Sequence, residues 1–281
     1  MVFGTSWCRI AVAGLAAAFM SMAPAAEPEF RPQIGQPGKD VIWVPTPDEV
    51  VERMLRMAQT TSADIVYDLG SGDGKIVIAA ARSFGARATG FEFNPEMVKL
   101  SLRNAQAAGV TDKASFRQAD IFQIDISPAT VVTMYLLPSL NLKLRPQLLN
   151  LRPGTRVVSH SFDMDDWQPD EISTVEGRRS HMWYVPAPVA GAWTVTTNDT
   201  AGSARFEIML DQRYQILDGY VRLGRVVAGL RQPRLTGAAI SFTIVDDQGV
   251  RRDFTGTVNG ASMDGRYLTD KGQEGRWSAR R

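Results

Sequence analysis

Three acidic residues end three short apolar segments of the chain, and a glycine-rich run follows the first of them. These residues are Asp68, Glu92 and Asp120, and the run is Gly70–Gly74, with the sequence GSGDG. Glycine has no Cβ, so such a run lets a ligand approach the backbone closely. Carboxylates beside it would accept hydrogen bonds from hydroxyl or amino groups and would favour a ligand with positive charge.

Two kinds of nucleotide site compete for this pattern. A dinucleotide site needs the spacing G-x-G-x-x-G and a pyrophosphate at the start of the next helix. Here the third glycine, Gly74, comes one residue early, Lys75 stands where the pattern has glycine, and Asp68 would repel a pyrophosphate. This spacing disfavours a nicotinamide oxidoreductase. S-adenosylmethionine suits the residues better, because it has a sulfonium, an α-ammonium, a ribose diol and an adenine. We predict that Glu92 accepts the ribose hydroxyls and that Asp120 accepts the adenine amino group.

Strands and helices alternate along residues 64–162. Such alternation predicts an α/β fold, in which a parallel sheet carries helices on both faces and ligands bind at the carboxyl edge. The acids at the strand ends therefore meet at one edge of the sheet. The predicted strands are 64–69, 88–93, 114–119, 130–137 and 156–162, with 178–185 as a further candidate, and the helices are 75–84, 95–109 and 139–151, the last broken near Pro146.

A further helix precedes the first strand. Thr46 is a good N-cap residue, Pro47 suits the first helical position, and Glu49 stands three residues after Thr46. This spacing is typical of a capping box, in which the Thr46 hydroxyl would bond to the backbone at the start of the helix.

The pattern changes near residue 189. From there on, short alternating segments are separated by turn residues at intervals of about eight to twelve residues, which predicts a small all-β barrel or sandwich with a docking role. Trp193 and Trp277 stand near its two ends and are expected to plug its interior. The predicted strands are 193–197, 205–210, 215–223, 239–245, 253–258 and 275–279.

The N-terminus has the pattern of a secretory signal peptide. One charged residue, Arg9, precedes an apolar run over residues 10–20, and small residues follow at 23–25. We therefore divide the chain into a signal peptide (1–25), an extended lead-in (26–43), an α/β domain (44–188) and a β-domain (189–281). We expect export to the periplasm; the alternative is an uncleaved segment that anchors the chain to the inner membrane.

Composition limits the classes of partner. The chain has 281 residues, with 31 basic against 30 acidic side chains, and a net charge of +1 argues against nucleic acid as a partner. Its single cysteine, Cys8, excludes an internal disulfide and a zinc site made of four cysteines. We predict no metal site.

Three segments of the chain resemble a known family. They are VPTP at 44–47, YDLGSGDG at 67–74 and YLLP at 135–138. Together they resemble the class I S-adenosylmethionine-dependent methyltransferases, in the branch with the lysine methyltransferases of ATP synthase and the adenine-nucleotide carrier. The resemblance covers about residues 40–187. It implies a Rossmann-like sheet of seven strands in the order 3-2-1-4-5-7-6, and methyl transfer to a protein lysine (EC 2.1.1.-).

The resemblance and the residue pattern together give a predicted site. Tyr135 is the candidate catalytic residue, which would hydrogen-bond the acceptor amine; the alternative is a packing role. His160 and His181 are candidates for a general base, although a structural role is favoured for both. The residues expected to bind S-adenosyl-L-methionine are Asp68, Gly70, Ser71, Gly72, Glu92, Asn94, Asp120 and Ile121.

One rival function stays open at the level of the sequence. The export signal is compatible with a ligand- or protein-binding module built on a degenerate methyltransferase scaffold. Such a module would keep the fold but would bind no S-adenosylmethionine.

Overall fold

The chain folds into two β-sheets, the first with helices on both faces and the second without helices. The computed structural model describes residues 1–2, 4, 30–199, 202–246 and 248–281, of which Pro32–Arg281 form one compact unit. The predicted signal peptide falls on residues that lie, apart from three near the start, outside this description. Among the residues described, no helix is long and apolar enough to span a membrane.

The first sheet is the seven-stranded Rossmann-like sheet that the resemblance implied. Its strands stand in the order β3-β2-β1-β4-β5-β7-β6, which confirms the expected topology. The first five are parallel, and β7 runs antiparallel to both β5 and β6. Their bounds are β1 Ile65–Leu69, β2 Arg87–Glu92, β3 Ala114–Gln118, β4 Val131–Met134, β5 Arg156–His160, β6 Glu171–Val175 and β7 Arg178–Tyr184.

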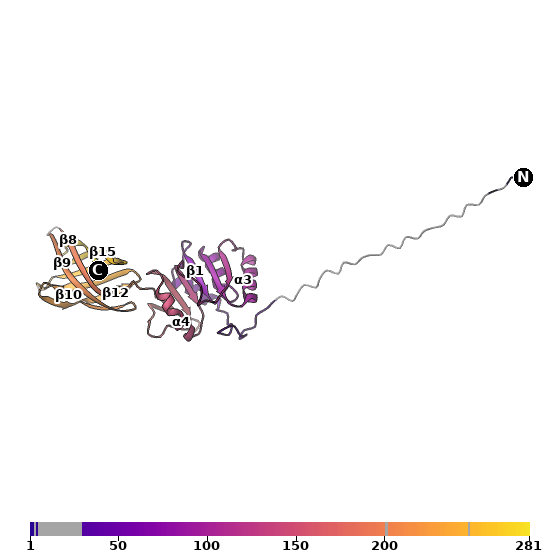
Figure 1. Ribbon diagram of the computed structural model, residues 1–281, viewed down its shortest axis with the longest axis horizontal. Helices are drawn as coiled ribbons and strands as arrows, with labels where there is room; N and C mark the ends of the chain where they lie inside the picture. The colour runs from indigo at the N-terminus through magenta and orange to yellow at the C-terminus, as the bar shows by residue number, and fades with distance from the viewer. Residues whose placement is uncertain (3, 5–29, 200–201, 247) are drawn as a thin grey trace. The chain divides into compact units, whose positions relative to one another are not determined.

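Four helices cover this sheet (Figure 1), and their buried side chains form two hydrophobic layers with it. α1 (Asp48–Met57), α2 (Lys75–Phe84) and α3 (Pro95–Ala107) contribute to the core on one face. α4 (Pro138–Leu149) packs on the other face, where Leu144 and Leu148 are fully buried. The two layers fix the strands, and therefore the positions at which their carboxyl ends present side chains.

Three local predictions are wrong. The capping box does not form: Pro47 occupies the N-cap position of α1 without a side-chain bond, and the Thr46 hydroxyl lies 3.2 Å from Nδ1 of His160. Losing a Thr cap costs a helix about 0.5–2 kcal/mol, so another use of the hydroxyl outweighs this loss. α4 is not broken at Pro146, because its buried leucines hold it against the sheet. β4 ends at Met134 rather than residue 137, because α4 begins at Pro138.

The second sheet is antiparallel and nearly closed into a barrel (Figure 1). Only Leu230 separates the two edge strands in the sequence, and its backbone N–H donates to the carbonyl of Gly219 at 2.9 Å. The order is β11-β10-β9-β8-β16-β15-β14-β13-β12. The bounds are β8 Gly191–Asp199, β9 Gly202–Arg213, β10 Ile216–Leu223, β11 Val226–Gly229, β12 Arg231–Thr236, β13 Ala239–Val245, β14 Arg251–Asn259, β15 Ser262–Thr269 and β16 Glu274–Arg280.

Aromatic side chains fill the barrel interior as predicted. Trp193 and Trp277 are 1% and 2% exposed, and Phe254 packs against both Trp277 and Phe242. Of the nine strands, β11, β12 and β15 were not predicted. Glycine, proline and charged residues interrupt their sequences, so the apolar alternation that marks a strand is weak there.

Gly90, in the middle of β2, leaves no room for a side chain. An ideal Cβ on it would lie 2.5 Å from Oγ of Ser71 and 2.7 Å from the Phe116 ring. We expect Gly90→Ala to lower the free energy of unfolding by about 1–3 kcal/mol through overpacking. Urea denaturation measures this change. Gly229→Ala is the control, since nothing lies within 4 Å of its added Cβ; equal losses in the two variants would contradict the packing argument.

Candidate functional site

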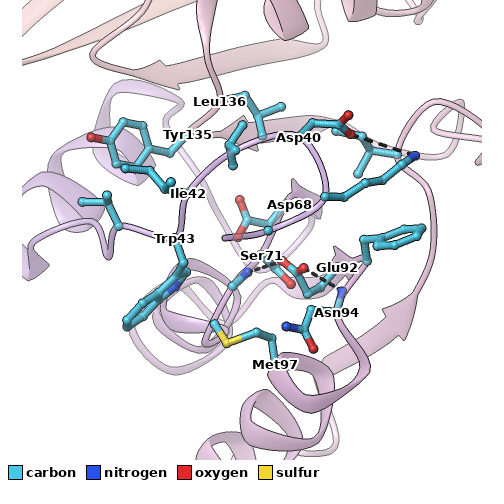
Figure 2. A pocket seen from close by; sticks show the side chains of 18 of the residues that line it. Asp40, Ile42, Trp43, Asp68, Ser71, Glu92, Asn94, Met97, Tyr135 and Leu136 are labelled. Carbon is cyan, nitrogen blue, oxygen red and sulfur yellow. Dashed lines mark hydrogen bonds and ion pairs between the residues drawn. The ribbon is translucent and has the colours of Figure 1, made fainter. Parts of the chain in front are cut away.

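A cavity of about 300 Å³ opens at the carboxyl edge of the first sheet. All its lining residues lie between Gln36 and Phe162, so the barrel contributes none of them. Figure 2 shows Asp68 near the centre of the lining, with Tyr135 on one side and Glu92 and Asn94 on the other. The predicted catalytic residue, Tyr135, and all predicted cofactor-binding residues line this cavity: Asp68, Gly70, Ser71, Gly72, Glu92, Asn94, Asp120 and Ile121.

The glycine loop adopts a backbone conformation that requires glycine. Gly70, Gly72 and Gly74 have φ values of 80°, 54° and 82°, in the left-handed region. A Cβ on Gly74 would lie 2.6 Å from the Phe116 ring, which shows how closely this turn packs on the sheet. The hydroxyl of Ser71 is buried and has no hydrogen-bond partner among the described residues. The loop thus presents bare backbone to the cavity, while the Ser71 hydroxyl lies against Gly90 of β2.

Glu92 is fixed by the backbone at both of its oxygens. Oε2 accepts a hydrogen bond from the N–H of Gly72 at 3.0 Å, and Oε1 accepts one from the N–H of Asn94 at 2.9 Å. Asn94 in turn caps α3, because its side-chain oxygen accepts from the N–H of Glu96 at 2.9 Å. The carboxylate therefore ties the glycine loop to the start of α3, and its remaining lone pairs are available to a ligand.

Asp68 is the buried acid of the site. It is 2% exposed, and the Thr133 hydroxyl donates to its Oδ1 at 2.7 Å. Burial raises the pKa of Asp68 to about 7, although the Thr133 bond opposes the shift; the nearby charges of Asp73 and Glu92 raise it further. A cationic group placed beside this carboxylate would restore its ionised form.

A hairpin covers part of the cavity, and the sequence did not predict it. Within the predicted lead-in, residues 35–43 form this N-terminal hairpin, in which the N–H of Gly35 donates to the carbonyl of Trp43 and the N–H of Trp43 to that of Gln36, both at 2.9 Å. Nζ of Lys39 lies 2.8 Å from Oδ2 of Asp120, and this ion pair lowers the pKa of Asp120. The carboxylate of Asp120 therefore already has one partner, Lys39, before any ligand binds.

The indole of Trp43 forms a wall of the cavity beside the glycine loop. Its Nε1 would lie 2.8 Å from a Cβ on Gly72, so the ring packs directly on the backbone there. The hint in the sequence was a tryptophan in a segment otherwise rich in proline and glycine.

Removal of the Trp43 ring tests whether the hairpin belongs to the ligand site. We expect Trp43→Ala to weaken binding of S-adenosylmethionine about tenfold, as expected for the loss of about 1.4 kcal/mol of apolar contact. Isothermal titration calorimetry measures the dissociation constant. Ile34→Ala is the control, because Ile34 is 73% exposed and does not line the cavity. If both variants bind alike, the hairpin is not part of the site.

Tyr135 packs against aromatic neighbours while it lines the cavity. Its ring centroid lies 4.0 Å from that of His160 and 6.3 Å from that of Phe162. The packing role is therefore present, and the hydrogen bond to an acceptor amine stays a prediction. His160 and His181 are both buried and neither lines the cavity, although His160 lies directly behind Tyr135.

Comparison with known proteins identifies relatives of the α/β part. Residues 68–171 match the family described as the ANTKMT methyltransferase domain. A protein-lysine N-methyltransferase of Saccharolobus islandicus (strain REY15A) is 49% identical over 148 residues, which are 52% of this chain and 92% of that protein. An ATP synthase lysine N-methyltransferase of Mus musculus is 33% identical over 174 residues, 62% of this chain and 68% of that protein.

A solved structure agrees with the fold. A crystal structure described as an RNA methyltransferase from Salinibacter ruber in complex with S-adenosyl-L-homocysteine is 55% identical, with a TM-score of 0.51. The match covers 52% of this chain and 96% of that one. Nearly all of that protein therefore corresponds to about half of this chain.

The protein is a class I S-adenosylmethionine-dependent methyltransferase (EC 2.1.1.-), as the resemblance predicted. Its strand order, its glycine loop and the acids at the ends of successive strands are those of this class. The chain belongs to the branch of this family with the ANTKMT methyltransferase domain, to which a C-terminal barrel is appended.

Proposed function

We propose that this chain transfers the methyl group of S-adenosylmethionine to a lysine amine of a protein. The observation that carries the proposal is the arrangement of one cavity, with Asp68 near its centre, an acidic end at Glu92 and an apolar end at Tyr135 and Leu136. The names of the archaeal and mouse relatives, both lysine N-methyltransferases, support the same acceptor.

The residues at the acidic end fit the cofactor. Glu92 would hold the ribose hydroxyls and Asp120 the adenine amino group, as the sequence predicts. Asp68, the buried acid, would hold the α-ammonium. Gly70 and Gly72 would let the ligand approach the backbone. When bound, S-adenosylmethionine supplies a methyl carbon that its positive sulfur already activates.

The apolar end would prepare and align the acceptor. A lysine amine has an unperturbed pKa near 10.4 and must lose a proton before it attacks. Burial beside Leu136 and the ring of Tyr135 would disfavour the ammonium form, so the proton leaves to solvent as the side chain enters. The neutral nitrogen then forms a bond to the methyl carbon while the carbon–sulfur bond breaks. The residues of this chain align the two reactants and exclude water.

Methyl transfer to protein tests the proposal. The mature chain is incubated with S-adenosylmethionine and heat-treated bacterial protein, and methyllysine is quantified by mass spectrometry after hydrolysis. We expect methyllysine to form with the wild-type chain and to be strongly reduced with Glu92→Ala. A parallel incubation with total RNA, followed by nucleoside analysis, addresses the description of the Salinibacter ruber protein. Methylated nucleosides without methyllysine would overturn the proposed acceptor.

We infer in addition that the chain is exported. The support is the sequence of residues 1–25, a charged start followed by an apolar run and small residues. That run is about half of the roughly 20 residues that span a bilayer, which favours cleavage over anchoring. N-terminal sequencing of chain recovered from a periplasmic extract should begin after Ala25. An intact N-terminus in the membrane fraction would instead support the inner-membrane anchor, and one in the cytoplasm would overturn export.

A further inference from the structure

Three polar side chains from separate segments meet at the apolar end of the cavity. Thr46 precedes α1, Tyr135 follows β4, and His160 ends β5. The hydroxyl of Thr46 lies 3.2 Å from Nδ1 of His160, and the Tyr135 ring packs against the same imidazole, with the ring centroids 4.0 Å apart and the planes tilted by 39°. Thr46 and Tyr135 line the cavity, whereas His160 lies behind them and is 1% exposed.

The imidazole of His160 is suited to holding its neighbours rather than to exchanging protons. Burial, together with the charge of Arg178, lowers the pKa of His160 to about 4. The ring is therefore neutral at physiological pH and is a weak base. One nitrogen bonds to Thr46, and the other, Nε2, has no partner in the described part of the chain.

The helix that follows Thr46 lacks a side-chain cap. The spacing of Thr46 to Glu49 would allow a capping box, and capping would stabilise α1. The structure instead turns the hydroxyl to His160, and α1 begins without any side-chain cap. The chain thus gives up a stabilising interaction that its local sequence favours, and gains a hydroxyl fixed at the cavity wall.

We propose that His160 is a positioning residue for methyl transfer, which holds the hydroxyl of Thr46 and the ring of Tyr135 at the cavity wall where the acceptor amine enters. This inference rests on the proposed transfer to lysine. A neutral primary amine has two N–H groups and one lone pair. The fixed hydroxyl oxygen of Thr46 accepts one N–H group, and the ring of Tyr135 restricts the amine sterically, so that the lone pair is directed at the methyl carbon. His160 takes no proton in this scheme, and the bonds made and broken are those of the transfer itself.

Variants of His160 and of Thr46 test the contact between these two residues from each side. His160→Phe keeps a ring under Tyr135 but loses the bond to Thr46, whereas Thr46→Val loses the same bond from the other side. We expect each to lower kcat for methyllysine formation about 10- to 100-fold while the dissociation constant of S-adenosylmethionine changes less than twofold. Thr46→Ser, which retains a hydroxyl, should recover most of the rate lost in Thr46→Val.

A double variant and a matched control complete the test. If both residues act through one contact, the pair Thr46→Val with His160→Phe should be no slower than the slower single variant. His181→Gln is the control: it replaces another buried histidine, which does not line the cavity, and should retain kcat. Circular dichroism and cofactor affinity show whether each variant is folded.

The outcomes separate this inference from the proposed function. A wild-type chain that binds S-adenosylmethionine and methylates no lysine would overturn the proposed function, and this inference with it. A wild-type chain that methylates lysine, with folded His160→Phe and Thr46→Val variants of equal kcat, would overturn only the positioning role. Additive losses in the double variant would also overturn it, because the two side chains would then act separately.

Discussion

Replacing Asp68 with asparagine should weaken S-adenosylmethionine binding at least about 30-fold and at the same time stabilise the unliganded protein at pH 8. The first effect follows because the cofactor's ammonium loses its buried counter-charge, a loss of about 2–5 kcal/mol. The second follows because burial raises the pKa of Asp68 to about 7, so that its ionised form is costly in the empty fold. Calorimetric titration and urea denaturation measure the two effects.

The raised pKa of Asp68 determines how the stability of the unliganded protein changes with pH. The pKa of Asp68 is higher in the folded state than its ordinary value of 3.8, so its contribution to stability is fully present below pH 3.8 and is lost as the pH rises through about 7. We expect Asp68→Asn to gain roughly 2–4 kcal/mol over the wild type at pH 8, and progressively less toward pH 4. Wild-type affinity for the cofactor should rise between pH 6 and pH 8, and the variant's should not.

Asp125→Asn is the matched control for this pair of effects. Asp125 is exposed, accepts a hydrogen bond from the N–H of Ser127 and does not line the cavity. Its replacement should leave both affinity and the pH profile of affinity unchanged. An Asp68→Asn variant that bound the cofactor as the wild type does, or that was less stable than the wild type at pH 8, would contradict the role given to this acid.

Replacing Glu92 with alanine should weaken S-adenosylmethionine binding by about 1–3 kcal/mol, or roughly 5- to 150-fold. The loss has two parts: the ribose hydroxyls lose their acceptor, and the backbone N–H groups of Gly72 and Asn94 lose theirs. Glu92→Gln, which keeps one acceptor oxygen and removes the charge, should fall between alanine and the wild type. Isothermal titration calorimetry on the wild type and the two variants measures the three dissociation constants and so tests this order.

Glu96→Ala is the control for charge alone. Glu96 stands on α3 a few residues from Glu92, pairs with Lys99 at 2.8 Å at the surface and does not line the cavity. Its removal should leave cofactor affinity within about twofold, as expected for an exposed pair. Equal affinities for Glu92→Ala and Glu96→Ala would show that the ribose is placed wrongly.

The part of the site on the sheet could be predicted because sequence order determines it. Parallel strands present their carboxyl ends at one edge, so acids that end β1 and β2 and follow β3 must meet there. Asp68, Glu92 and Asp120 do so. The strand order came from the resemblance rather than from periodicity, because nothing in the local pattern orders β6 after β7.

The N-terminal hairpin and the Thr46 contact could not be predicted for the same physical reason. Both depend on contacts between residues far apart in the sequence: Lys39 with Asp120, and Thr46 with His160. Local propensity favours extended chain for the first segment and a capping box for the second. Tertiary contacts outweigh both, and no periodicity within the segments reports them.

A crystal structure of the chain with S-adenosyl-L-homocysteine tests the central claim most directly. We predict the ligand in the cavity over Gly70 and Gly72, with both ribose hydroxyls within hydrogen-bond distance of Glu92 and the amino group beside Asp68. A ligand bound elsewhere, or a ribose that makes no contact with Glu92 while that carboxylate keeps only its backbone bonds, would contradict the account.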